Sequence, residues 1–417
     1  MVEETPWQQA LRFANRADPY PFYKELRKTP VTREPDGTYV VSTYREVVQL
    51  LHDPRVSSDL TKCPQLFSML GADDPNLARE ATEPDIIGQD PPEHDRYRRL
   101  MLRHFYGPAD EPDWISRLEP EIRRIVGDLL DKLRGKTRFD VVDDFAYPLP
   151  VTLICRILGV PLEDERHFHA WIETALDSVD FGPEASSEEV LSRQKEGDEA
   201  YLEVYRYMSR LIDQYAKEPG PGMLSAMVHD DSPDGPMPKA ALVSNALLLL
   251  FAGHETTVNL IAHSVLTLLR HPDALEKLRS RPELIVPGVE EILRLESSVQ
   301  FWFTRSALRD IEIAGTTIPK GSPIFLVYGS ANRDPQRFEN PDVVDLERPH
   351  NDHVGYSQGI HFCFGAPLAR LEVQIAVDEF VRRVQNPRLV VDPPPYRRNQ
   401  VFRGPRHVLV DVDGVRD

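Results

Sequence analysis

The spacing of hydrophobic residues predicts a chain built mainly from helices. Apolar positions recur at helical intervals over most of the first two thirds, and turn-forming residues interrupt them at 107–112, 181–187 and 219–222. Prolines and glycines make residues 57–90 a long irregular stretch, and loops of this length usually signal function or mobility. The predicted helices of this part cover residues 18–28 and 44–51 and recur from 94 to about 215.

The last third of the chain predicts small, local sheets. Stretches rich in β-branched residues alternate there with turn signals at Gly315 and at residues 319–321. One earlier strand follows the Asp36-Gly37 turn. The predicted strands cover residues 39–42, 311–313, 316–318 and 324–327.

The longest helical pattern covers residues 238–270 and predicts a helix of about 45 Å, long enough to cross the whole molecule. At 100° per residue, one mostly apolar face also carries an alcohol, with Glu255 on its edge. Ala252 and Gly253 lack bulk, so a ligand could approach the backbone there. This face consists of Asn245, Leu248, Leu249, Ala252, Thr256 and Asn259.

Composition narrows the classes of function. The chain has 417 residues and three widely spaced cysteines, Cys63, Cys155 and Cys363, which suggest neither a disulfide framework nor a zinc site and favour the reducing cytoplasm. A formal net charge of −18 argues against a general nucleic-acid binder. The N-terminus is polar and the apolar run 246–252 is too short to span a bilayer, so we expect no signal peptide and no membrane anchor.

The most informative segment is GIHFCFGAPLARLE, residues 359–372. Cys363 lies directly before residues of high helix propensity, and Pro367 falls in the tolerated first turn. The helix dipole and free N–H groups stabilise a thiolate at a helix N-terminus, so we expect the pKa of Cys363 to fall and its sulfur to ligate a metal. Gly365 would leave the sulfur unobstructed. This loop alone fits a buried structural thiol equally well.

Seven residues of this segment match the haem-binding signature of the cytochrome P450 monooxygenases, and the chain resembles soluble, bacterial-type members of that family. They are Gly359, His361, Cys363, Gly365, Leu368, Ala369 and Arg370. The resemblance implies that Cys363 is the thiolate ligand of a haem b iron. It also implies one mainly α-helical domain over residues 1–417, with a long central helix and small β-sheets, and we expect the tail at 411–417 to be disordered. Tyr356 and Ser357 depart from the Phe-Gly usual in the family.

The middle of the long helix, Ala252-Gly253-His254-Glu255-Thr256-Thr257, resembles the oxygen-activation segment of the same family. The resemblance implies that Ala252 adjoins the cofactor, and that Glu255 and Thr256 relay protons to dioxygen by general acid chemistry. From the residues alone, an alternative stays open. In it, Thr256 bonds back to its own preceding turn and Glu255 lies on a solvated edge.

Two further sets of residues take their meaning from the resemblance. Glu291 and Arg294 alone would predict only a surface pair. The resemblance implies a structural triad with Arg348 that holds the loop before the haem. It also implies that four basic residues bind the two haem propionates, which need cations or hydrogen-bond donors. These four are His94, Arg98, Arg305 and His361.

The function implied is insertion of one oxygen atom from O2 into a lipophilic small molecule, with hydroxylation as the default and epoxidation or oxidative coupling as variants. No nucleotide-binding glycine fingerprint or iron–sulfur cysteine cluster is present, so we expect no bound flavin and a separate ferredoxin or flavodoxin as electron donor. Alternatives are a peroxide-using haem-thiolate enzyme, a non-catalytic haem-binding protein and an all-helical interaction protein. The expected pocket residues are Asn245, Leu248, Leu249, Val299, Phe301 and Phe402.

A basic strip is predicted on the helix that begins near His94. Counted from His94 at 100° per residue, Arg96, Arg99 and Arg103 point away from the expected haem face. In an acidic chain such a strip could dock an acidic electron donor, steered by charge. The alternative is an ordinary solvated helix face, balanced by neighbouring carboxylates.

Overall fold

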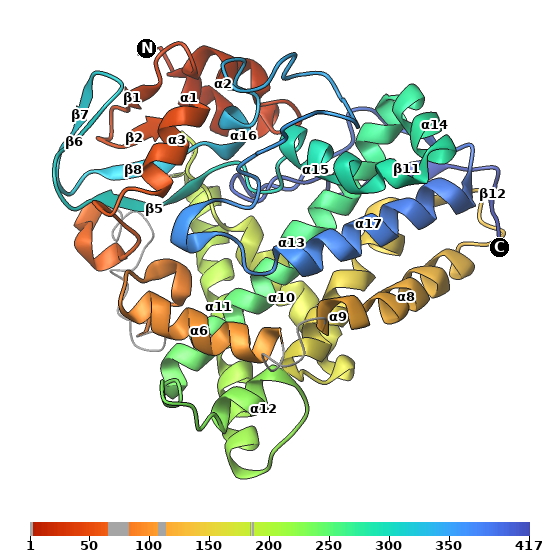
Figure 1. Ribbon diagram of the computed structural model, residues 1–417, viewed down its shortest axis with the longest axis horizontal. Helices are drawn as coiled ribbons and strands as arrows, with labels where there is room; N and C mark the ends of the chain where they lie inside the picture. The colour runs from red at the N-terminus through yellow and green to blue at the C-terminus, as the bar shows by residue number, and fades with distance from the viewer. Residues whose placement is uncertain (1–2, 66–82, 107–113, 184, 186) are drawn as a thin grey trace.

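The computed structural model describes residues 3–65, 83–106, 114–183, 185 and 187–417. Helices make up most of this part of the chain, and the longest, α13 (Lys239–Arg270), runs through the middle of the molecule (Figure 1). The predicted helix over residues 238–270 and the mainly α-helical fold are therefore confirmed.

Helix α13 is the centre of the helical packing. The helices that contact it most extensively are α9 (Pro148–Leu158), α11 (Glu188–Lys217), α15 (Ile285–Leu295) and α17 (Ala366–Arg383). A Cβ atom added at Gly253 would lie 3.0 Å from Ile154 of α9, so the small residue serves close helix packing rather than the approach of a ligand that we expected.

The other helices surround this centre. They are α1 (Pro6–Leu11), α2 (Tyr20–Leu26), α3 (Tyr44–Leu51), α6 (Glu93–Phe105), α7 (Trp114–Arg117), α8 (Glu119–Lys132), α10 (Glu165–Asp177), α12 (Gly222–Val228), α14 (Pro272–Ser280) and α16 (Tyr328–Ala331). Short 3-10 turns occur at η1 (Phe13–Asn15), η2 (Leu60–Lys62), η3 (Ile86–Gly88), η5 (Leu162–Asp164), η6 (Pro282–Leu284) and η7 (Gly359–His361), and η4 (Val142–Ala146) is a π-helical turn.

The largest sheet has five strands in the order β1-β2-β8-β5-β3 and lies beside the first helices, at the upper left of Figure 1. Strands β2 and β8 run parallel with Tyr39 opposite Ile324, and β5 pairs antiparallel with β8. The strands of this sheet are β1 (Val31–Arg33), β2 (Tyr39–Val41), β3 (Val56–Ser57), β5 (Trp302–Ala307) and β8 (Pro323–Leu326).

Three smaller sheets complete the fold, and one of them corrects an expectation. The tail at 411–417 was expected to be disordered, but Gly414 and Val415 pair with Gln385 and Val384. Backbone hydrogen bonding explains the order, because Arg416 N also donates to Arg383 O. The strands of these sheets are β4 (Arg138–Asp140), β6 (Ile311–Ile313), β7 (Thr316–Ile318), β9 (Val384–Gln385), β10 (Arg388–Leu389), β11 (Leu409–Asp411) and β12 (Gly414–Val415).

Among the described residues, α13 is also the one helix long and apolar enough to cross a membrane, with a mean hydropathy of 1.3 over an 18-residue window. Most of that window, 72%, is buried inside the protein. A helix that is hydrophobic on all sides is expected at the core of a large domain. From the sequence, the apolar stretch 246–252 was judged too short to span a bilayer. The structure shows a longer apolar helix, and its burial in the core again argues against this segment as a membrane anchor.

Candidate active site

The Cys363 loop connects η7 to α17. The N–H of Cys363 donates to the carbonyl of Tyr356 at 2.9 Å, and the N–H of Ala366 donates to the carbonyl of Cys363 at 3.3 Å. Gly359 has a φ of +71° and a Cβ there would meet Leu51 O at 2.4 Å, so only glycine fits the turn that begins the loop. The loop is thus held in place by its own backbone and by α3.

The Cys363 thiol differs from the sequence expectation in one respect. Burial raises the pKa of Cys363, and the N–H groups of Gly365 and Ala366 together with Arg98 only partly offset this effect. The helix end alone therefore does not produce the thiolate. The side chain is nonetheless accessible, and a Cβ on Gly365 would lie 3.9 Å from the sulfur. A bound metal ion would supply the missing charge, since coordination deprotonates a thiol.

Four basic side chains gather beside this loop, as the propionate prediction requires. The rings of His94 and His361 lie 4.6 Å apart. His361 Nε2 and Ser58 Oγ form a hydrogen bond of 2.8 Å, and Arg98 donates to the carbonyl of Phe362 at 2.7 Å. Burial and the nearby charges of Arg305, His94 and Arg98 lower the pKa of His361 to about 2. The cluster is therefore short of negative charge.

Two side chains of this cluster, His94 and Arg305, show whether the carboxylate groups of a haem would fit here. His94 is 1% exposed, and its Nε2 has no hydrogen-bond partner among the described residues. Arg305 on β5 is 4% exposed, donates to the carbonyl of Thr304, and has no carboxylate within ion-pair distance in the described part of the chain. Buried cations are normally paired. Two propionates would satisfy both groups, so the residues present fit a haem.

The central turns of α13 present a narrow accessible face. Leu248, Phe251, Ala252 and Thr256 are partly accessible, whereas the residues around them are mostly buried. Thr256 Oγ1 donates to Ala252 O at 2.7 Å, which is the back-bond of the alternative interpretation. Sequence reasoning missed Phe251, although its spacing of three from Leu248 indicates the same face.

Glu255 is buried, which contradicts the solvated edge of that alternative. Its side chain lies 3.1 Å from Arg397 Nε and accepts a hydrogen bond from Asn259 at 3.1 Å. Burial raises the pKa of Glu255, and the positive charge of Arg397 opposes this shift. One buried arginine therefore opposes the effect of burial on this acid.

A chain of charged side chains joins Glu255 to the protein surface. Arg397 donates to Glu173 of α10 at 3.1 Å, and Arg406 lies 2.9 Å from the same carboxylate. Arg406 then pairs with the half-exposed Asp143 at 3.1 Å. Sequence reasoning missed these partners, because they come from segments far from α13 in the chain.

The predicted structural triad forms. Arg294 on α15 donates to both carboxylate oxygens of Glu291 at 2.8 Å, and Arg348 Nε lies 3.0 Å from each of them. Glu291 and Arg294 are fully buried, so this is a core ion pair and not a surface pair. Arg294 also donates to the carbonyls of Asn332 and Pro341, and thereby fixes the segment that leads to the Cys363 loop.

The predicted pocket residues divide into two groups. Leu248, Val299 and Phe402 are partly accessible, and Val299 and Phe402 pair through their backbones. Leu249 is 6% exposed and packs in the core. Phe301 is fully buried, and its ring centroid lies 4.9 Å from that of Trp7. Leu249 and Phe301 therefore belong to the predicted segments, but neighbouring side chains fill the space that each of them faces.

Asn245 also differs from its predicted place. Its amide oxygen accepts a hydrogen bond from Ile86 N at 3.0 Å, and its amide nitrogen donates to Ala241 O at 2.8 Å. The predicted polar anchor of the pocket therefore joins α13 to η3, because the backbone of η3 needs a buried acceptor there.

Tyr356 occupies a buried position behind the thiolate loop. It is 9% exposed, its hydroxyl has no hydrogen-bond partner among the described residues, and Arg370 lies 4.5 Å from its ring centroid. Burial and the carboxylate of Glu290 raise the pKa of Tyr356, so the phenol stays neutral.

The basic strip on α6 is only partly as predicted. Arg99 and Arg103 are exposed, but Arg96 is half-buried and donates to the carbonyls of Asp234 and Pro236. Arg99 pairs with the Asp234 side chain at 2.8 Å. Two exposed arginines therefore remain on this face, and one of them is already paired.

Comparison with known proteins agrees with this geometry. The family model described as Cytochrome P450 matches residues 45–410. Cytochrome P450 107B1 of Saccharopolyspora erythraea is 35% identical over 400 residues, which cover 94% of this chain and 93% of the relative. The solved structure of the bacillaene polyketide synthase cytochrome P450 PksS of Bacillus subtilis has a TM-score of 0.84 and 30% identity, covering 98% and 99% of the two chains.

A second solved structure shows P450BioI in complex with an acyl carrier protein that bears hexadec-9Z-enoic acid. It has a TM-score of 0.83 and 34% identity, and the match covers 96% of this chain and all of that chain. The family match, these relatives and the arrangement around Cys363 agree. The chain belongs to the cytochrome P450 family of haem-thiolate monooxygenases.

Proposed function

We propose that this protein hydroxylates a lipophilic small molecule with O2, using haem b held by Cys363. The observation that carries the proposal is the partly buried basic cluster of His94, Arg98, Arg305 and His361 next to the Cys363 loop. Apart from Asp95, which lies 2.8 Å from His94 Nδ1, no carboxylate of the described residues pairs with the cluster, which is thus matched to a cofactor with two carboxylates. Epoxidation and oxidative coupling would use the same site.

The haem, when bound, supplies the activation of dioxygen. The side chains of this protein would bind the haem and hold the protons that the reaction needs. Cys363 supplies the thiolate, and the basic cluster holds the propionates in place. Thr256 holds a hydroxyl proton at Oγ1, and Arg397, itself paired with Glu173, positions the Glu255 carboxyl that would take up and release protons. The buried position of Glu255 supports monooxygenase chemistry over peroxide use or simple haem binding, neither of which needs an acid there.

A lipophilic substrate is proposed from the walls of the site. Leu248, Phe251, Val299 and Phe402 are apolar and partly accessible, and apolar walls suit a lipophilic ligand. The names of the relatives agree, since one is the cytochrome P450 of a polyketide synthase and another was solved with a fatty acid on an acyl carrier protein. We place the reaction in bacterial secondary metabolism and the protein in the cytoplasm.

Electrons are proposed to come from a separate ferredoxin or flavodoxin. Arg99 and Arg103 on α6 are the exposed cations of the predicted docking strip. Reversing the charge of Arg103 should slow the first electron transfer from an acidic ferredoxin and flatten its salt dependence. An unchanged rate and salt slope would place the donor elsewhere.

The function is tested with haem-loaded protein, ferredoxin, its reductase and NADPH. Compounds are first screened for a low-spin to high-spin shift, and turnover of those that bind is then run under ¹⁸O₂. The proposal expects one labelled oxygen atom in the product and water as the other product. In Thr256→Ala, the spin shift should persist while more NADPH is consumed per product. Turnover only with added hydrogen peroxide would support the peroxide-using alternative instead.

A further inference from the structure

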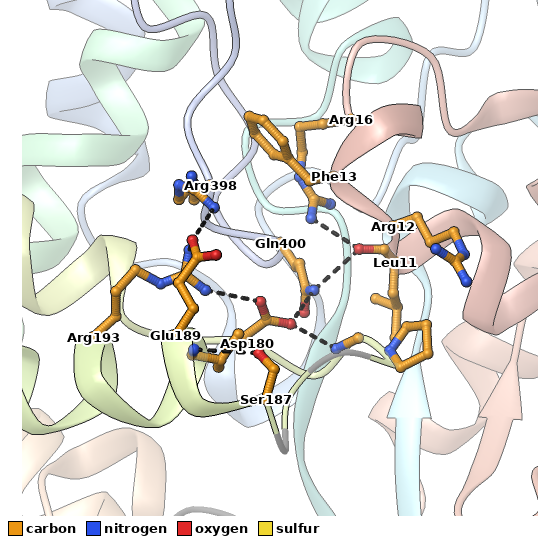
Figure 2. A pocket seen from close by; sticks show the side chains of 13 residues that line it. Leu11, Arg12, Phe13, Arg16, Asp180, Ser187, Glu189, Arg193, Arg398 and Gln400 are labelled. Carbon is orange, nitrogen blue, oxygen red and sulfur yellow. Dashed lines mark hydrogen bonds and ion pairs between the residues drawn. The ribbon is translucent and has the colours of Figure 1, made fainter.

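A small polar pocket lies away from the Cys363 loop, where three segments meet. These segments are the residues after α1, the connection between α10 and α11, and the stretch before β11 (Figure 2). The pocket has a volume of about 70 Å³. The charged and amide side chains that line it are Arg12, Arg16, Asp180, Glu189, Arg193, Arg398 and Gln400.

Arg16 is the most unusual of these groups. It is 4% exposed, and burial lowers its pKa to about 10. Its one side-chain hydrogen bond goes to the carbonyl of Leu11 at 3.1 Å, and its Nε has no partner among the described residues. No carboxylate of the described chain lies within 4.0 Å of the guanidinium. A buried guanidinium without an acid is costly unless a ligand supplies the charge.

The other charged residues leave the pocket with an excess of positive charge. Asp180 is engaged by Gly182 N, Gln400 and Arg193 at 2.8, 2.7 and 3.3 Å. Even so, Nε and Nη1 of Arg193 make no hydrogen bond with any residue that the structure describes. Arg398 pairs loosely with Glu189 at 3.5 Å. Arg12 is already paired with Glu4, so three arginines face the two carboxylates, in a chain whose net charge is −18.

The size of the pocket limits what it can hold. A volume of about 70 Å³ has room for roughly five water molecules, enough for a carboxylate or phosphate group and too small for a whole lipophilic substrate. Phe13 adds one apolar side chain at the pocket, since it is 48% exposed and its ring centroid lies 5.2 Å from Cζ of Arg398. An anionic head with an apolar chain matches this combination.

One residue of the pocket lies close in the chain to the proposed substrate wall. Gln400 lies two residues before Phe402, and two residues of extended chain span about 7 Å. On the other side, Phe181 N donates to Gln400 Oε1 at 2.6 Å, and the Phe181 ring lies 4.7 Å from that of Phe303. Phe181, Phe303 and Phe402 are partly accessible and pack against one hydrophobic cluster, which includes Leu11 of the pocket lining.

We propose that this arginine pocket binds the oxyanion end, a carboxylate or a phosphate, of the substrate, while the apolar remainder extends toward the haem. The inference deepens the proposed function and rests on it for the identity of the ligand as the substrate. Charge-assisted hydrogen bonds from Arg16, Arg193 and Arg398 would supply the affinity.

The test is calorimetric titration of the haem-loaded protein with dodecanoate, dodecyl phosphate and dodecan-1-ol. We expect at least one of the two anions to bind about tenfold or more tightly than the alcohol, and the tighter anion identifies the carboxylate or the phosphate as the ligand group. Arg16→Gln and Arg398→Gln should each remove most of this preference. Arg309→Gln, an exposed arginine outside the pocket, should keep it.

Equal affinity of the wild-type protein for the anions and the alcohol would overturn the proposal, as would a preference that survives Arg398→Gln. Arg398 is half exposed, so this variant tests the pocket even where loss of the buried Arg16 prevents folding. Heats of binding do not depend on oxygen chemistry. A protein that binds dodecanoate through these arginines but fails the ¹⁸O₂ test would therefore refute the monooxygenase reaction and not the anion site.

Discussion

Replacing Arg397 with glutamine should change the protonation of Glu255 more than it changes the fold. Arg397 is 4% exposed and is the one cation within 4.0 Å of Glu255 in the described part of the chain. Its loss leaves a buried carboxyl whose pKa burial already raises. Glu173 keeps Arg406 as a partner at 2.9 Å, so the surface end of the charge chain remains paired.

The size of the effect follows from the contact. An opposite charge within about 4 to 6 Å lowers a carboxyl pKa by roughly 1 to 3 units, so its removal should raise the pKa of Glu255 by a similar amount. Each unit corresponds to about 1.4 kcal/mol. Protonation also limits the loss of stability, because the variant does not have to bury an unpaired carboxylate. Its free energy of unfolding should fall as pH rises above 4.5, where an unfolded glutamate ionises.

The assay is the fraction of NADPH electrons recovered in product, measured against pH for wild type, Arg397→Gln and Arg397→Lys. The glutamine variant should move the profile to higher pH by roughly 1 to 3 units, and lysine, which keeps the charge, should move it less. Haem content and the substrate-induced spin shift should stay unchanged. If the profile stays in place in Arg397→Gln while haem content is normal, Arg397 does not control Glu255 and the proton path lies elsewhere.

Three further predictions follow from buried groups. Burial raises the pKa of Glu372 from 4.5 to about 8, so the folded state holds this proton more tightly than the unfolded chain does. The free energy of unfolding should therefore fall by up to about 5 kcal/mol as pH rises from 4.5 through 8. Glu372→Gln should remove this pH dependence in urea unfolding, and an unchanged pH dependence would contradict the prediction. Glu291→Gln leaves Arg294 and Arg348 without their carboxylate partner and should lower the free energy of unfolding in urea by about 3 to 5 kcal/mol. An unchanged urea midpoint would show that the ion pair does not stabilise the fold. Tyr356→Phe should shift the reduction potential, and an identical potential would make the phenol incidental.

The parts of the site that the sequence predicts are those carried by short, local spacing. The Cys363 loop, the Glu291-Arg294 pair and the Glu255-Thr256 pair each lie on one element, so helical geometry or a contiguous motif places them. The long helix α13 can also be predicted from the sequence, because its apolar pattern continues for its full length.

The parts that the sequence does not predict depend on contacts between distant segments. Nothing near Arg397 in the chain indicates that it meets Glu255, and nothing near Ile86 indicates that its N–H needs Asn245 as an acceptor. The direction of the Cys363 pKa shift was wrong for a related reason. The helix end is visible in the sequence, whereas the desolvation that outweighs it comes from the whole fold.

The most direct test of the account is the carbon monoxide spectrum of the reduced, haem-loaded protein. Thiolate ligation by Cys363 predicts a strongly red-shifted Soret band, unchanged in Cys63→Ser and Cys155→Ser, both of which alter buried cysteines outside the loop. Cys363→Ser should lose that band. A red-shifted band that persists in Cys363→Ser would contradict the account, because some other group would then be the iron ligand.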